Sequence, residues 1–460
     1  MGHADAVFLS RLQFAFTLGY HILWPAFSIG IAGFLVVLNA AWLKTRRPVY
    51  LQLLNFWTRI FALAFGMGVV TGVVISYELG TNWPGFAEAT ANVLGPLFTF
   101  EVLSAFFLEA GFIGILLFGR GRVSDRVHLG ATVVVAFGTL MSAFWILAAN
   151  SWMHTPAGFE VIDGRFVATD WFKVVFNPSF PFRLAHMVLA SYITGSFVVI
   201  GVSAFYLLRG QHLEFARTAL SICLWQVLVL MPIQFVVGDA HGLNTREHQP
   251  VKLAAIEARW ETAREVPLTL FAIPNQKEER NDYAIEIPKL GSLILTHELH
   301  GEVRGLKEVP ADRRPPVIVV FFAFRIMVGC GVLMLAIAAA GFVLRRRGRL
   351  FSTRWYLGAC MLGTPLGFIA ILAGWTVTEV GRQPYVVYGQ LLTADAAARI
   401  APQAVATTLV VFLILYNLLL LGFFWFAGRI VLHGPAPIDG APPPPRAAAL
   451  LATLEDARHG

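Results

Sequence analysis

Long apolar stretches recur along the whole chain, and they restrict it to one kind of fold. Nine of them are long enough for a helix to cross a bilayer, since a spanning helix needs about 20 mostly apolar residues. They lie at roughly 13–43, 52–77, 95–119, 128–149, 181–208, 216–238, 317–344, 356–379 and 403–428. A mean hydropathy of +0.66 and a charged fraction of 14% exclude a soluble globular domain. The sequence predicts an all-α, polytopic membrane protein with nine transmembrane helices. The first stretch is too long for a cleaved signal peptide, so we expect it to be retained.

The basic residues follow a topological pattern. Groups of them follow the first, third, fifth and seventh stretches. These residues are Lys44, Arg46, Arg47, Arg120, Arg122, Arg126, Arg209, Arg217, Arg345, Arg346, Arg347, Arg349 and Arg354. By the positive-inside rule those loops are cytoplasmic, which puts the N-terminus outside and the C-terminus in the cytoplasm. The net charge of +7 therefore reports membrane orientation, and we expect no nucleic-acid partner.

The remaining chain divides the protein into four predicted parts. They are a six-helix part at 1–238, an outer loop at 239–316, a three-helix part at 317–432 and a Pro-rich cytoplasmic tail at 433–460. Within the outer loop, Leu253, Ile256 and Trp260 recur at helical spacing, which predicts a short amphipathic helix lying on the membrane surface. No internal repeat is found, which argues against a secondary transporter built from repeated halves.

Ionisable side chains inside the apolar stretches are the first candidates for function, because each costs a few kcal/mol to insert. The residues singled out on this ground are His21, Glu101, Glu109, His186, Arg325 and Glu379. The three cysteines, Cys223, Cys330 and Cys360, also lie in apolar stretches and fit buried, small apolar side chains. The chain has no C-x-x-C-H motif, so a haem would have to be held without thioether bonds.

Two histidines and one methionine form a candidate haem-ligand set. His21 and His186 are the only two of the twelve histidines that lie in the interior of an apolar stretch. Met327 follows the buried cation Arg325 by two residues, and a haem propionate would neutralise that cation. A His/Met pair is a known axial set for a low-spin haem, and His186 and Met327 are both expected in the outer half of the membrane. The alternatives are a histidine hydrogen-bonded to a neighbouring helix and a methionine that only packs.

Three carboxylates form the other part of the candidate site. Glu101 and Glu109 are eight residues apart, about 12 Å of rise and about 80° of rotation in an α-helix, so both can follow one side of it. A protonatable relay is the sharper interpretation, and a salt bridge is the alternative. Glu379 lies one turn after Trp375 and three residues before Arg382. It is either an oxygen ligand to iron or the end cap and ion-pair partner of Arg382.

Eight motifs along the chain carry a family resemblance. In order they are SRLQFAFTLGYHILW, SYELGTNWP, FEVLSAFFLEAGFIG, ILAANSWM, FRLAHM, KLAAIEARWET, FRIMVGCG and GWTVTEVGRQPY. Together with the nine stretches, they resemble subunit I of the cytochrome bd-type quinol oxidases over essentially the whole chain to about residue 430. The short loop between the sixth and seventh stretches is similar to the short-loop branch, which includes cyanide-insensitive oxidases. The family's GRQPW reads GRQPY here, with Tyr385 in place of the indole.

The resemblance implies a set of haem and iron ligands. It makes His186 and Met327 the axial ligands of a low-spin haem b, with Arg325 beside it. It makes His21 and Glu379 the axial ligands within a pair of high-spin haems. One of these is a haem b and the other is haem d or a third haem b, and which ligand holds which haem stays open.

The resemblance also implies roles for the other site residues. Glu101, next to the oxygen-reducing haem, forms a proton route with Glu109. Lys252 and Glu257, in the outer loop, match the family's residues that are associated with quinol oxidation. Residues expected to support the haem site or to line polar paths near it are Arg382, Trp375, Asn150 and Ser104.

The implied activity is quinol:oxygen oxidoreduction in the bacterial cytoplasmic (inner) membrane. Quinol is oxidised outside, dioxygen is reduced to water with cytoplasmic protons, and a proton-motive force arises without a pump. The implied partners are a homologous second subunit and, in addition, a small single-helix subunit. Two alternatives are weighed against it: a proton-coupled transporter using Glu101 and Glu109, which leaves the histidines unexplained, and a cytochrome b membrane anchor, which needs no carboxylate at an oxygen site.

Overall fold

Nine helices among residues 3–437, the part of the chain that this computed structural model describes, are apolar and long enough to cross a membrane. They confirm the predicted number of spans. They run Asp5–Thr45, Pro48–Thr81, Pro84–Phe118, Asp125–His154, Phe180–Arg209, Leu213–His248, Ala311–Arg346, Arg354–Val380 and Pro402–His433. Most exceed the predicted stretches at both ends. Hydropathy marks only the part of a helix that lies in hydrocarbon, and polar residues carry the same helix beyond it.

Helices account for most of the structure. Their bounds are α1 His3–Thr45, α2 Pro48–Thr81, α3 Pro84–Glu101, α4 Phe107–Phe118, α5 Asp125–His154, α6 Trp171–Val175, α7 Phe180–Arg209, α8 Leu213–His248, α9 Pro250–Ile256, α10 Leu290–Thr296, α11 Val317–Arg346, α12 Arg354–Leu362, α13 Leu366–Val380, α14 Thr393–Ala396 and α15 Pro402–His433. A π-helical turn, Val102–Phe106, joins α3 to α4 within one span. The eighth span is broken between α12 and α13, just before Pro365, which precedes the first residue of α13.

Four short antiparallel strand pairs lie in the connections between the long helices. They are β1 Phe159–Ile162 with β2 Arg165–Ala168, β3 Ala263–Arg264 with β6 Glu302–Val303, β4 Leu268–Asn275 with β5 Arg280–Ile287, and β7 Tyr385–Val387 with β8 Leu391–Leu392. Single 3-10 turns at Leu306–Glu308 and Ala311–Arg313 lead into α11.

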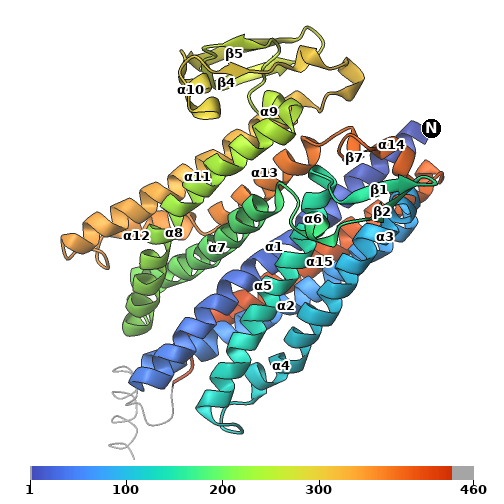
Figure 1. Cartoon of the computed structure of the whole chain (residues 1–460). Helices are drawn as coiled ribbons and strands as arrows, with labels where there is room; N and C mark the ends of the chain where they lie inside the picture. Colours follow the sequence, from blue (N-terminus) through green and yellow to red (C-terminus); the bar gives the residue numbers. More distant parts are fainter. Residues whose placement is uncertain (1–2, 438–460) are drawn as a thin grey trace, which may run out of the picture.

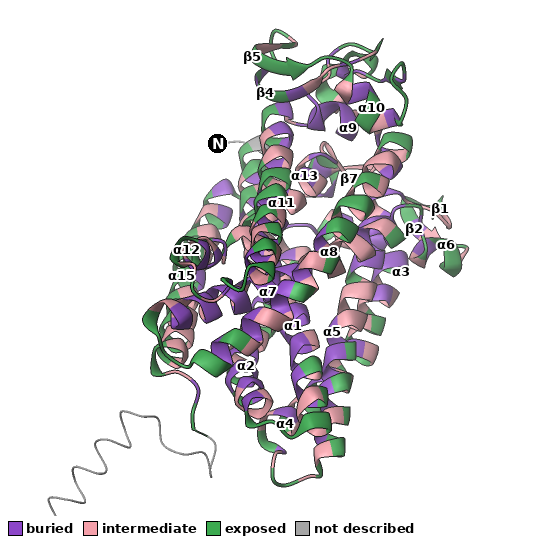
Figure 2. Ribbon diagram, turned by 90° about the vertical axis from the view of Figure 1, so that its left-hand side faces the viewer, coloured by how far each residue is buried: buried purple, intermediate pink, exposed green. Residues whose placement is uncertain are grey.

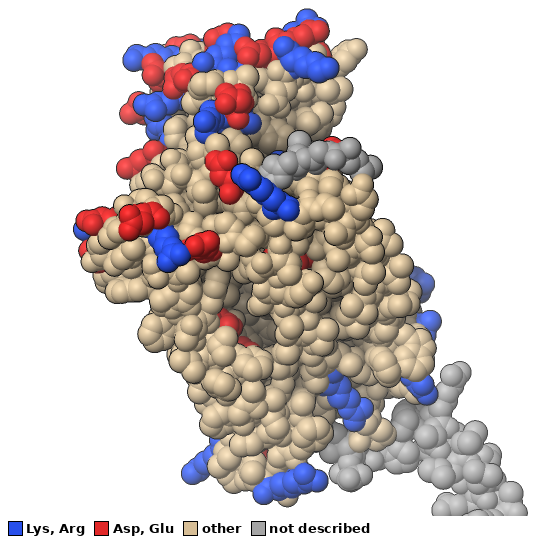
Figure 3. Space-filling model, turned by 90° about the vertical axis from the view of Figure 1, so that its right-hand side faces the viewer, with Lys and Arg blue, Asp and Glu red and all other residues tan. Residues whose placement is uncertain are grey.

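The long helices form one bundle, and residues 249–316 cap one end of it (Figure 1). We call this the loop end, and the opposite end, where the α4–α5 and α11–α12 connections lie, the basic end. In Figure 3 acidic and basic side chains mix at the loop end, whereas the charged side chains visible at the other end are basic. This asymmetry agrees with the charge pattern from which the orientation was predicted.

The core of the bundle is built around α1 and α7. Buried residues gather on these two helices, whereas α15 has the smallest buried share of the nine spans in the described chain (Figure 2). The two helices touch through glycine: a Cβ at Gly30 would lie 2.3 Å from the Ser191 carbonyl oxygen, and one at Gly195 would lie 2.9 Å from the Gly30 backbone. A side chain at either position would therefore force the helices apart.

The outer loop differs from the prediction in two ways. α8 continues to His248, so the predicted boundary at residue 239 falls inside a helix. The predicted amphipathic segment does form a helix, α9, but it does not lie on the membrane surface. Leu253, Ile256 and Trp260 are all buried in the protein, and Ile256 and Trp260 share a cluster with Val317 and Phe321 of α11. Tertiary packing against α11 thus accounts for the apolar spacing.

The C-terminal prediction is tested only in part. α15 ends at His433, and residues 434–437 follow it. The rest of the predicted Pro-rich tail, 438–460, lies outside the described residues. The division of the chain into four parts stays a prediction.

Candidate functional site

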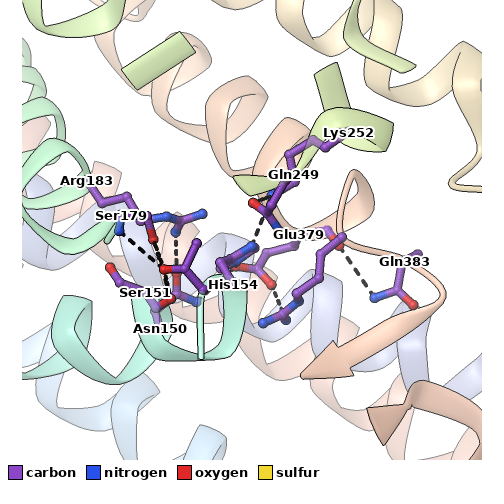
Figure 4. Close-up of polar contacts among 11 residues, drawn as sticks. Asn150, Ser151, His154, Ser179, Arg183, Gln249, Lys252, Glu379 and Gln383 are labelled. Carbon is purple, nitrogen blue, oxygen red and sulfur yellow. Dashed lines mark hydrogen bonds and ion pairs between the residues drawn. The ribbon is translucent and has the colours of Figure 1, made fainter. Parts of the chain in front are cut away.

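Glu379, the penultimate residue of α13, is the centre of a polar network at the loop end (Figure 4). Asn150 Nδ2 donates a hydrogen bond of 2.9 Å to Glu379 Oε1, and His154 Nε2 lies 3.3 Å from the same oxygen. Arg382 pairs with the other oxygen, Oε2, at 2.5 Å. The ion pair with Arg382, one of the two alternatives for Glu379, is therefore present. An iron-ligand role for Glu379 stays a prediction.

The network reaches the residue that the sequence associated with quinol. Lys252 Nζ lies 3.0 Å from His154 Nδ1 and donates a 2.7 Å hydrogen bond to Gln249 Oε1. The ring of His154 thus bridges Lys252 of α9 and Glu379 of α13, and its side chain is fully buried. On the other side Arg183 Nη1 donates a 2.6 Å hydrogen bond to Asn150 Oδ1. Side chains from α5, α7, α9 and α13 converge here.

Lys252 is held in unusual surroundings for a lysine. Only 3% of the residue is exposed. Burial, reinforced by the nearby guanidinium groups of Arg183 and Arg382, holds the pKa of the Lys252 amine well below its usual value, although Glu379 opposes this. The amine can therefore accept a proton or a hydrogen bond where an exposed lysine would already be charged.

Arg325 pairs with an acid of the outer loop, and its place beside a haem propionate stays a prediction. Arg325 Nη2 donates to Glu257 Oε2 at 2.9 Å and to the Thr269 carbonyl at 2.6 Å, while Nη1 donates to the Ile256 carbonyl. The sequence offered no acid near Arg325 in its own helix, and the loop supplies one from 68 residues away. Arg325 Nε is buried without a hydrogen-bond partner, so one N–H donor of the guanidinium stays available.

His186 and Met327 lie on α7 and α11, two helices that both pack against α8 and α13. His186 Nδ1 is buried and has no hydrogen-bond partner, which contradicts the alternative of a histidine tied to a neighbouring helix through that atom. Glycines leave room beside both side chains. A Cβ at Gly238 would lie 3.5 Å from the His186 ring, and one at Gly374 would lie 3.0 Å from Met327 Sδ.

His21 lies on α1 with one ring nitrogen already engaged. Its Nδ1 lies 2.9 Å from Thr71 Oγ1 on α2, and Thr71 in turn donates to the Met67 carbonyl. The contact orients the ring and leaves Nε2 for another partner. Trp375 is partly buried in an apolar cluster with Ile22 and Met187, the chain neighbours of His21 and His186. It therefore lies between the helices that carry the two histidines.

Glu101 and Glu109 face the same side of α5. Ser142 Oγ donates a 2.7 Å hydrogen bond to Glu101 Oε1, and a Cβ at Gly138 would lie 2.7 Å from Glu109 Cγ. Gly138 and Ser142 are one turn apart, so the two carboxylates lie along one stripe of α5. No ion pair to either carboxylate occurs within residues 3–437, which contradicts the salt-bridge alternative.

The π turn explains this alignment, and it corrects the predicted geometry. In a regular α-helix eight residues make two turns and about 80° more. The π turn Val102–Phe106 lies between the two carboxylates and contains about one residue more than an α-helical turn. The eight residues from Glu101 to Glu109 therefore complete about two full turns, which brings both side chains to the same side. Ser104 lies in this turn and accepts a 2.8 Å hydrogen bond from Trp145 Nε1 of α5. That Ser104 and Asn150 line polar paths stays a prediction.

Sequence reasoning missed three polar residues of these networks. Glu78 of α2 is fully buried and accepts hydrogen bonds from Gln13 Nε2 at 3.0 Å and Thr17 Oγ1 at 2.7 Å. Glu78 and His154 were not identified as candidates, because the predicted stretches ended at residues 77 and 149. Arg183 lay inside its stretch, in the motif FRLAHM, but was not singled out. A search of each motif beyond the apolar boundary would have found the first two.

The predicted iron ligands do not form a cluster of their own. No group of three or more His, Cys, Asp or Glu side chains suited to a metal ion occurs in the described part of the chain. His21, His186, Met327 and Glu379 lie on four different helices. Isolated ligands suit haem iron, because the porphyrin supplies four of the iron's ligands itself.

A sequence model of the family described as cytochrome bd terminal oxidase subunit I matches residues 9–435. The chain belongs to this family. Cytochrome bd subunits I from Escherichia coli and Bacillus subtilis are among its relatives. "Cytochrome bd-II ubiquinol oxidase subunit 1" of E. coli is 31% identical, with 95% of this chain and 99% of the relative covered. "Cytochrome bd ubiquinol oxidase subunit 1" of B. subtilis is 34% identical, with 89% of each covered.

The solved structure of the bd oxidase from Geobacillus thermodenitrificans is similar to this one. The TM-score is 0.89 at 33% identity, with 95% of this chain and the whole of that chain covered. These comparisons confirm the predicted family and the nine-helix membrane fold of a cytochrome bd subunit I. The family is haem-containing and works with a second subunit. Membership of the short-loop branch and the role of each site residue stay predictions.

The position that departs from the family motif also has its own contacts. Tyr385, the first residue of β7, makes an edge-to-face contact with Tyr388 at 5.7 Å, and the Arg313 guanidinium lies 5.8 Å from its ring centroid. An aromatic packing role is therefore kept at the end of GRQPY, without the indole N–H donor.

Proposed function

We propose that this protein oxidises quinol at the loop end and houses the site where dioxygen is reduced to water. The observation that carries the proposal is the hydrogen-bonded connection from Lys252 through His154 to Glu379. It joins the residue assigned to quinol with a residue assigned to haem iron through one buried side chain. A transporter or a simple cytochrome anchor has no need of this connection.

The residues present fit haem groups. Arg382 is buried, and its Nε and Nη1 atoms have no hydrogen-bond partner although Nη2 pairs with Glu379. A buried guanidinium with unsatisfied N–H groups requires an acceptor, and a haem propionate is one. The unpartnered Nδ1 of His186 and the glycine beside Met327 Sδ are consistent with a group bound between α7 and α11.

Under this proposal His186 and Met327 hold a low-spin haem b. His21 and Glu379 hold the two high-spin haems, one a haem b and the other haem d or a third haem b, with Arg382 and Trp375 in support. When bound, the haems accept electrons one at a time and bind dioxygen for its reduction. The protein's part is to orient these groups, to keep water out and to deliver protons.

At the quinol end two arrangements favour deprotonation of the substrate. The lowered pKa of Lys252 makes its amine an acceptor for a quinol hydroxyl proton. Glu257 is only 3% exposed and is kept in place by the guanidinium of Arg325. Both lie at the loop end, so protons that leave the quinol are released on that side.

Protons for water must come from the other side if the reaction is to generate a proton-motive force without a pump. Glu109 lies nearer the basic end than Glu101, and both follow one stripe of α5. We assign them as the carriers from the cytoplasm towards the haem site. The basic loops support a cytoplasmic basic end and hence an outer N-terminus.

The proposed setting is the bacterial cytoplasmic membrane. A homologous second subunit is the proposed partner, with a small single-helix subunit in addition. The surface made by α2, α3, α4 and α15 is the place for the second subunit. These spans have the smallest buried shares in the described chain, and a carboxylate shows in the hollow on the side drawn in Figure 3. A carboxylate facing lipid would be costly, so a protein partner is the better cover.

A reduced-minus-oxidised spectrum with pigment analysis of the purified complex, combined with quinol-dependent oxygen uptake, tests the proposal. We expect low-spin and high-spin haem bands together with quinol oxidation. A complex without haem would favour the transporter, and one with only low-spin b bands would favour the membrane anchor. The pigment analysis also decides between haem d and a third haem b.

A further inference from the structure

A groove opens between α11 and α13, apart from the polar networks. Its volume is about 530 Å³, within the range of small-molecule sites. Its lining residues are Ile318, Val319, Phe322, Ala323, Ile326, Ile369, Leu372, Ala373 and Thr376. All are apolar except Thr376, whose hydroxyl already donates a 2.9 Å hydrogen bond to the Leu372 carbonyl. The groove can therefore bind a ligand through its shape and through apolar contacts, but its lining has no free polar group to form a hydrogen bond with it.

The groove is open on the side that faces the hydrocarbon of the bilayer. Four of its lining side chains, Ile318, Val319, Ile326 and Ile369, are between 41 and 48% exposed. They lie on two membrane-spanning helices, so a flexible apolar chain can enter sideways from the lipid. Apolar surface gains little by moving from lipid to protein, so selectivity in such a groove has to come from close packing and from a polar anchor at one end.

The polar anchor lies directly at the loop end of the groove. α9 crosses the end of both helices there. A Cβ at Gly381, just after α13, would lie 2.8 Å from Lys252 Cγ, and Glu257, the residue after α9, pairs with Arg325 of α11. Ala323 lines the groove and also belongs to the apolar cluster under α9. The apolar groove thus begins where the polar residues of α9 end.

We propose that this groove binds the polyisoprenoid tail of the quinol, with the head group at α9. A molecule with one polar, hydrogen-bonding end and one long apolar chain matches the order of the two surfaces along α11 and α13. The inference rests on the proposed function, because it takes quinol as the substrate. Beyond the proposed function, it names the part of the substrate that the groove binds, the tail, and the two helices that bind it, α11 and α13.

The test is kinetic and compares two quinols with the same head group. One carries a short saturated chain and the other a polyisoprenoid chain of several units. Oxygen uptake is measured with the purified complex in phosphatidylcholine vesicles for two groove-filling variants, Val319→Trp and Ile369→Trp. The matched control is Val332→Trp, at a position of α11 that is 52% exposed and does not line the groove.

We expect both groove variants to raise KM for the polyisoprenoid quinol about tenfold while kcat is unchanged, as for a loss of uniform substrate binding. KM for the short-chain quinol and the reduced haem spectrum should match the wild type, and the control should match it with both quinols. Equal shifts with both quinols, or no shift with either because lipid alone fills the groove, would overturn the inference. If the wild-type complex oxidises neither quinol, the proposed function fails instead.

Discussion

Replacing His154 by leucine tests whether the bridge between Lys252 and Glu379 matters for catalysis. The substitution fills similar space and removes both polar contacts of the ring, at 3.0 Å and 3.3 Å. Lys252 keeps Gln249, and Glu379 keeps Asn150 and Arg382, so neither group is left alone. A buried polar group that loses a partner costs about 1–3 kcal/mol. Taking the lower figure for each of the two groups gives about 2 kcal/mol, or about a 30-fold fall in kcat/KM for quinol.

His154→Gln is the matched control. An amide can accept from Lys252 through its oxygen and donate to Glu379 through its nitrogen, which reproduces both contacts without an imidazole. We expect kcat/KM of the glutamine variant to stay within about threefold of the wild type. Steady-state oxygen uptake with quinol gives both constants, and pigment content and the reduced spectrum show whether the haem sites survive.

Two outcomes would refute this reasoning. Wild-type kinetics in the leucine variant, with full haem content, would mean that the bridge has no role in turnover. A glutamine variant as slow as the leucine variant would mean that the imidazole itself is required rather than its two hydrogen bonds. Loss of haem in the leucine variant alone would assign the bridge to holding the Glu379 side of the haem site.

Three further predictions follow from other contacts. Inserting one residue between the π turn Val102–Phe106 and Glu109 should turn the two carboxylates about 100° apart, so oxygen uptake should collapse while quinol still reduces the low-spin haem, whereas deleting one residue from the turn should leave the acids within about 20° of each other in a regular helix and spare oxygen uptake. Gly374→Leu should displace Met327 Sδ, since even a Cβ there would lie 3.0 Å from it, and the low-spin band should be lost or shifted in the reduced spectrum. Glu78→Leu should leave the Gln13 amide without its acceptor, since Thr17 can still donate to the Gln13 carbonyl at 3.1 Å, and should lower stability by about 1–3 kcal/mol, seen as a lower melting temperature in detergent, whereas Glu78→Gln should lower it less.

The number and order of the membrane helices could be predicted because apolar length is a local property of the sequence. The ends of the helices could not, because polar residues such as Glu78 and His154 continue a helix after the hydropathy has fallen. Glu379 and Glu101 were found because an ionisable side chain within an apolar stretch is conspicuous without any structure, whereas Lys252 was found only through the family resemblance of its motif.

Contacts between distant segments were beyond the reach of the sequence. The partner of Arg325 comes from a loop residue 68 positions away, and nothing in the α11 segment indicates it. The burial of α9 is a similar case, since its apolar spacing suits a membrane surface as well as a protein surface. The π turn could not be predicted either, because the change of hydrogen-bond register depends on how α3 and α4 pack against α5.

The π turn has a consequence for how the spacing of the two acidic residues can vary. In an uninterrupted α-helix, side chains seven residues apart face almost the same way, within about 20°, whereas those eight apart do not. A helix without the bulge would keep the two carboxylates aligned only if one residue between them were removed. The number of residues between the acids and the presence of the π turn therefore have to change together. A homologous helix with the acids seven residues apart should be a regular α-helix at the place where this one has a π turn.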